Sequence, residues 1–85
     1  MNWVDLIIKL VPIIIELVNP RLRPIADDVA HAINSSEQTR DLSSQEKLNH
    51  AVNLVMDKRD LTPTEVSQVQ EVINKTVEAS NVLTT

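Results

Sequence analysis

Residues 61–80, LTPTEVSQVQEVINKTVEAS, contain the clearest helix start in this chain. Thr62 can cap a helix, Pro63 suits the first helical position, and Glu65 completes a capping box. Largely apolar residues then recur at spacings of three and four, the period of one helix face: Val66, Val69, Ile73, Val77 and Ser80. The stretch therefore predicts one helix with a well-defined start and one buried face.

Two further helices are predicted before it. Ser43 and Glu46 form a second capping box, and Pro24 is a good first residue for a helix that carries Asp27 and Asp28 in its first turn. The apolar positions of both helices follow the helical period: Ile25, Val29, Ala32 and Ile33, then Leu48, Ala51, Val52 and Val55. No run alternates as a strand does and no hairpin dipeptide occurs, so the sequence predicts an all-α fold.

The N-terminal segment differs from the rest of the chain because residues 2–18 are apolar at nearly every position. Its inner polar positions form a stripe on one helical face: Asp5, Lys9, Pro12 and Glu16. The remaining arc is wider than the apolar face of an ordinary surface helix. We therefore predict a membrane or partner interface at Trp3, Val4, Leu6, Ile7, Leu10, Val11, Ile14, Leu17 and Val18.

A proline-rich connector joins this segment to an acidic body. Pro20 and Pro24 remove backbone donors and favour extended geometry in the residues before them. The expected organisation is an apolar helix at 1–19, a connector at 20–24 and a three-helix body at 25–85. Charge divides at the same place, with three bases and two acids in residues 1–24 and five bases and ten acids in residues 25–85.

Composition excludes most catalytic and cofactor-binding signatures. The 85 residues contain neither Cys nor Gly, which removes thiolate chemistry, Cys-ligated metal sites and the glycine-rich phosphate loops. Glu46 and His50 share a helix face, but a metal site needs three or four ligands. The net charge of −4 opposes nucleic-acid binding. We expect that this protein is not an enzyme and that it has no cofactor, no metal site and no small-molecule substrate.

The wide arc allows two kinds of partner. Residues 3–18 would span about 24 Å, less than the hydrocarbon core of about 30 Å, so a bilayer crossing requires several associated copies that shield the polar stripe. Arg21 and Arg23 would then be interface anchors, and the body would lie in the cytoplasm. Alternatively, the arc packs on protein subunits in an assembly and no membrane is involved.

Three short stretches carry a family resemblance: AINSSEQ (residues 32–38), EKL leading to AV (46–52) and EVINKTV (71–77). With these, the chain resembles small bacteriophage holins of the LL-H type over about residues 25–77. The resemblance implies a bacteriophage protein that makes lesions in the host cytoplasmic membrane. We expect a non-enzymatic, holin-like protein that self-associates through its N-terminal helix. The alternative is a minor virion component, capsid-lining, connector or tail, that docks on other phage subunits. A third hypothesis is a regulator that inhibits a host protein through its acidic body.

Overall fold

The computed structural model describes residues 2–38 and 41–84, and every regular element in them is helical. The elements are α1 (Trp3–Val18), the 3-10 helix η1 (Pro20–Ile25), α2 (Ala26–Glu37), α3 (Ser44–Lys58) and α4 (Pro63–Leu83). The predicted all-α fold is therefore confirmed, with an N-terminal helix, a proline-containing connector and three further helices.

Both predicted capping boxes are present. The N–H of Glu46 donates to Ser43 Oγ (3.2 Å) and the N–H of Ser43 donates back to Glu46 Oε1 (3.1 Å). The equivalent bonds between Thr62 and Glu65 measure 3.2 and 3.0 Å. These side chains satisfy backbone donors that the first turn of a helix leaves without partners, which fixes where α3 and α4 begin. Asn2 also caps α1, since its Oδ1 accepts the N–H of Asp5.

The connector is helical, and α2 starts later than the sequence predicts. Asn19 Oδ1 accepts the N–H of Arg21 (3.1 Å), and Pro20 then opens η1. The N–H of Ala26 donates to the carbonyl of Arg23, an i to i−3 bond that continues the 3-10 geometry past Pro24. The expected helix start at Pro24 is therefore wrong by two residues, because the tighter turn runs on to Ile25.

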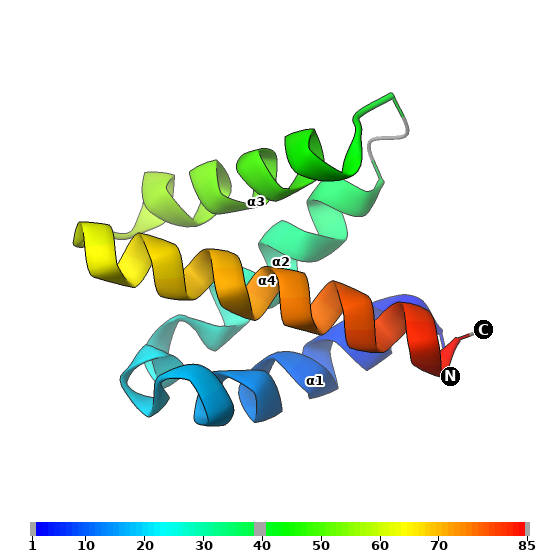
Figure 1. Ribbon diagram of the computed structural model, residues 1–85, viewed down its shortest axis with the longest axis horizontal. Coiled ribbons are helices and arrows are strands. Elements are labelled where there is room, and N and C mark those ends of the chain that lie inside the picture. The colour runs from blue at the N-terminus through cyan, green and yellow to red at the C-terminus, as the bar shows by residue number, and fades with distance from the viewer. Residues whose placement is uncertain (1, 39–40, 85) are drawn as a thin grey trace.

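α1 and α4 lie antiparallel, so that both chain ends are at the same end of the molecule (Figure 1). The side chain of Asn19 at the end of α1 donates to Gln68 Oε1 in α4 (2.8 Å). α1 also packs on α2, and α3 packs mainly on α2. Ile7, Val11 and Ile15 of α1 are completely buried in the same core as the apolar residues of the other helices. The N-terminal helix is thus an integral part of the hydrophobic core.

α1 continues as one 16-residue helix through Pro12. Pro12 is exposed, on the polar stripe of the helix. Among the described residues, none of the helices combines the length and the hydrophobicity that a bilayer crossing requires.

Candidate functional site

The apolar arc of α1 faces two directions. Ile7, Val11, Ile14 and Ile15 point inward and pack against the chain's own helices. Three of these four belong to the interface that the sequence predicts: Ile7, Val11 and Ile14. In this fold they stabilise the monomer, because the arc is wide enough to serve both the core and an outer surface.

The outward part of the arc is a continuous row, formed by Leu6, Leu10, Ile13 and Leu17, which we call the outer row. Its members share one side of α1 because they are spaced by four, three and four residues. Ile13 and Leu17 are 57% and 77% exposed, while Leu6 and Leu10 are half-buried. The predicted interface omits Ile13, although this heptad-like spacing is visible in the sequence.

The C-terminal end of α4 extends this surface. A shallow groove of about 550 Å³ lies between the two helices, lined by Ile14, Leu17, Lys75, Glu78, Ala79, Val82 and Leu83. Val82 and Leu83 are 71% and 63% exposed. We call the outer row together with Ala79, Val82 and Leu83 the apolar surface. Sequence analysis missed the contribution of α4, because the antiparallel packing of α1 on α4 is what brings the two helices together.

The polar stripe borders the outer row on its other side. Asp5, Lys9, Pro12 and Glu16 are all exposed. Beyond the stripe, Val4 and Ile8 form a second, smaller exposed apolar flank of α1. The two remaining predicted interface residues are half-buried: Trp3 and Val18.

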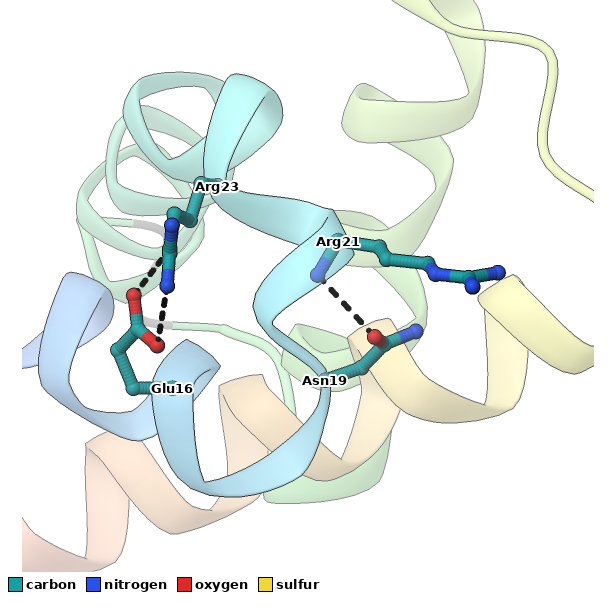
Figure 2. A network of polar contacts seen from close by, with 4 residues as sticks. All are labelled: Glu16, Asn19, Arg21 and Arg23. Atoms are coloured by element: carbon teal, nitrogen blue, oxygen red, sulfur yellow. Dashed lines mark hydrogen bonds and ion pairs between the residues drawn. The ribbon is translucent and has the colours of Figure 1, made fainter.

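The two predicted anchors have different environments. Arg23 donates from both Nε and Nη2 to the carboxylate of Glu16, with 2.9 Å between Nη2 and Oε2 (Figure 2). The hydrogen bond from Arg23 lowers the pKa of Glu16, and the same pair raises the pKa of Arg23. Arg21 is exposed, and its guanidinium extends away from this pair (Figure 2). The charge of Arg23 is thus already balanced within the chain.

A second, polar cleft of about 250 Å³ lies between α2, α3 and α4, and sequence reasoning missed it. On its wall, Lys47 Nζ contacts Glu37 Oε2 at 3.3 Å. Ser36, which also lines the cleft, is hydrogen-bonded through Oγ to His50 Nδ1 at 2.9 Å. The charges of Lys47 and Glu37 offset each other, so the cleft offers a ligand no net charge from this pair. Ser36 and His50 come together only because α2 and α3 pack as a pair.

The described residues contain no group of three or more potential metal ligands. Glu46, which shares a face with His50, is engaged at the start of α3. The bond from the Ser43 backbone N–H lowers its pKa, so its carboxylate serves the helix cap.

Comparison of the chain with protein-family models, curated proteins and solved structures finds no match.

Proposed function

We propose that this chain is a non-enzymatic helical assembly protein that binds other protein subunits through its apolar surface. One observation carries the proposal. Of the seven large apolar side chains that are exposed among the described residues, four lie together on the apolar surface: Ile13, Leu17, Val82 and Leu83. Scattered exposed apolar residues are normal, but a gathering of this kind marks an interaction site.

The involvement of α1 in the core favours a protein partner over insertion into a bilayer. To cross a membrane, α1 would have to leave the fold and expose the sites on α2 and α4 that Ile7, Val11 and Ile15 now cover. Burying each such side chain contributes about 1.5–3 kcal/mol. Binding through the apolar surface needs no such rearrangement. The family resemblance implies a bacteriophage origin. A minor virion component is the kind of bacteriophage protein that binds other subunits through such a surface.

A second candidate is the holin-like protein at the host cytoplasmic membrane. The observation in its favour is the second apolar flank, Val4 and Ile8, which lies on the other side of the polar stripe from the outer row. Apolar side chains on both flanks would let α1 lie in the surface of a membrane. Several associated copies would then place their polar stripes against one another. In that case the protein binds lipid even when its charges are screened.

Vesicle flotation combined with sedimentation velocity separates the two candidates. The full chain is mixed with phosphatidylethanolamine and phosphatidylglycerol vesicles at low and high salt. An assembly protein self-associates or binds protein subunits and stays at the bottom of the gradient. A holin-like protein floats, and high salt does not release it. Flotation in high salt would overturn the assembly proposal.

Point variants locate the binding surface without disturbing the core. Leu17→Gln changes the most exposed member of the outer row, while Met56→Gln changes an exposed apolar residue of α3. We expect Leu17→Gln to weaken association and Met56→Gln to leave it unchanged. Equal loss in both variants would contradict a site on α1. Deleting α1 is a poor test, because the deletion also removes Ile7, Val11 and Ile15 from the core.

A further inference from the structure

The geometry points to a second copy of this chain as the occupant of the apolar surface, with the two α1 helices packed antiparallel about a two-fold axis. This inference rests on the proposed function, because it names the partner of the same surface. In such a dimer each outer row packs against the outer row of the other copy. A two-fold contact requires a surface that complements itself, and α1 meets that requirement in shape and in charge.

The spacing of the outer row suits a helix partner. Leu6, Leu10, Ile13 and Leu17 alternate steps of four and three, the pattern of a coiled-coil seam over two heptads. In an antiparallel pair centred between Leu10 and Ile13, Leu6 of one copy meets Leu17 of the other. Leu10 of each copy likewise meets Ile13 of the other. The most exposed residue of the row, Leu17, thus packs against a half-buried one in both copies.

Charge selects the antiparallel orientation. Lys9 and Glu16 border the outer row on the same side, and both are exposed. Antiparallel packing brings Lys9 of one copy to within about two residues, or about 3 Å along the axis, of Glu16 of the other, and does so twice. Parallel packing would instead place Lys9 and Glu16 of the two copies on opposite sides of the seam, where they could not pair with each other.

The intrachain pair of Glu16 with Arg23 is compatible with this contact. A carboxylate offers about four lone-pair positions, of which Arg23 uses two. The side chain of Glu16 is 46% exposed, so its carboxylate can also accept Lys9 of the second copy.

The end of α4 widens the interface on the opposite side of the outer row. Val82 and Leu83 are exposed beside the groove, and Lys75 and Glu78 give its rim one positive and one negative charge. A membrane rich in anionic lipid would favour a rim of cations alone. The balanced rim and the acidic chain, at −4, favour a protein surface over such a membrane.

Sedimentation equilibrium of the full chain tests this dimer with a matched pair of variants. Ile13→Gln changes the outer row, and Ile8→Gln makes the same substitution at a similarly exposed position (51% against 57%) on the other flank of α1. We expect a monomer–dimer equilibrium that Ile13→Gln weakens at least tenfold, because the residue occurs twice in a two-fold interface. We expect Ile8→Gln to change the dissociation constant of the dimer less than twofold. Circular dichroism verifies that both variants keep their helices.

A charge exchange tests the orientation. Lys9→Glu and Glu16→Lys should each weaken the dimer, because each places like charges together across the two-fold axis. The double variant restores opposite charges between the copies, so it should recover most of the lost affinity. Failure of the double variant to recover would overturn the antiparallel arrangement.

The failure of this inference differs from a failure of the proposed function. If the chain self-associates but Ile13→Gln and Ile8→Gln behave alike, the proposed dimer is wrong while an assembly role stands. If the chain binds other proteins yet stays monomeric alone, the second copy is likewise excluded. If the chain remains monomeric at every concentration and binds neither protein subunits nor vesicles, both proposals are overturned.

Discussion

One buried hydroxyl lacks a hydrogen-bond partner among the described residues. Thr76 is completely buried on α4, and its Oγ1 meets no donor or acceptor there. A buried polar group without a partner costs about 1–3 kcal/mol. Thr76→Val replaces the hydroxyl by a methyl of the same shape, so we expect the free energy of unfolding to rise by about 1 kcal/mol.

Urea unfolding measures this change, and Thr64→Val serves as the control. Thr64 is exposed near the start of the same helix, where the same substitution should stay within about 0.5 kcal/mol. A loss of stability in Thr76→Val would show that its hydroxyl does have a partner in solution.

The capping box of α3 links stability to pH. The Ser43 N–H lowers the pKa of Glu46 below its ordinary value of 4.5. A lowered pKa in the folded state means that the carboxylate stabilises the fold above the unfolded pKa, and that this contribution disappears as pH falls through the folded value. Glu46→Gln should therefore be less stable than the wild type near neutral pH and approach it as pH falls from 4.5 through the lowered pKa of the folded state.

Thermal unfolding between about pH 3 and pH 7 measures this convergence. Asp57→Asn serves as the control, because it removes a carboxylate from the same helix at a position away from the start of that helix. A difference between wild type and Glu46→Gln that stays constant over the whole range would contradict the role of the Glu46 charge in the cap.

At the scale of the elements, the helices could be predicted where local chemistry fixes them. Ser43 with Glu46 and Thr62 with Glu65 satisfy the first-turn donors of their own helices, so sequence alone located those starts. The start of α2 was missed, because a proline suits the first position of an α-helix but also fits within a 3-10 helix.

The two faces of α1 could not be separated from the sequence. Apolar residues cover both its inner and its outer side, and periodicity does not distinguish a side chain in the core from one at a partner interface. Which side is buried depends on where α4 and α2 lie. The contacts of Glu37 with Lys47 and of Ser36 with His50 likewise depend on how two helices pack.

Two isoleucines of α1 test whether this helix belongs to the fold. Ile15 is completely buried and Ile13 is 57% exposed. At concentrations below those that support association, Ile15→Ala should lower the free energy of unfolding by about 3 kcal/mol. Ile13→Ala should lower it by less than about 1 kcal/mol. Chemical unfolding of both variants measures the contrast, and equal effects would mean that α1 does not pack into the core in solution.

For the whole molecule, the basic N-terminal part and the acidic body form one structure. The first 24 residues carry three bases and two acids, and the remainder carries five bases and ten acids. α1 nevertheless packs lengthwise on α4 and shares its core (Figure 1). The chain thus stabilises itself with the inner side of α1 and presents the outer side for association.

Hydrogen–deuterium exchange at low and high protein concentration tests that division of α1 most directly. The method reports how often the structure that protects each backbone amide opens. Burial of the apolar surface should therefore slow exchange in α1 and at the end of α4. We predict that exchange in α1 and near Val82 slows as concentration rises, while exchange in the middle of α3 does not change. Concentration-dependent protection confined to α3, or none anywhere in the chain, would contradict the assignment of the apolar surface as the site of association.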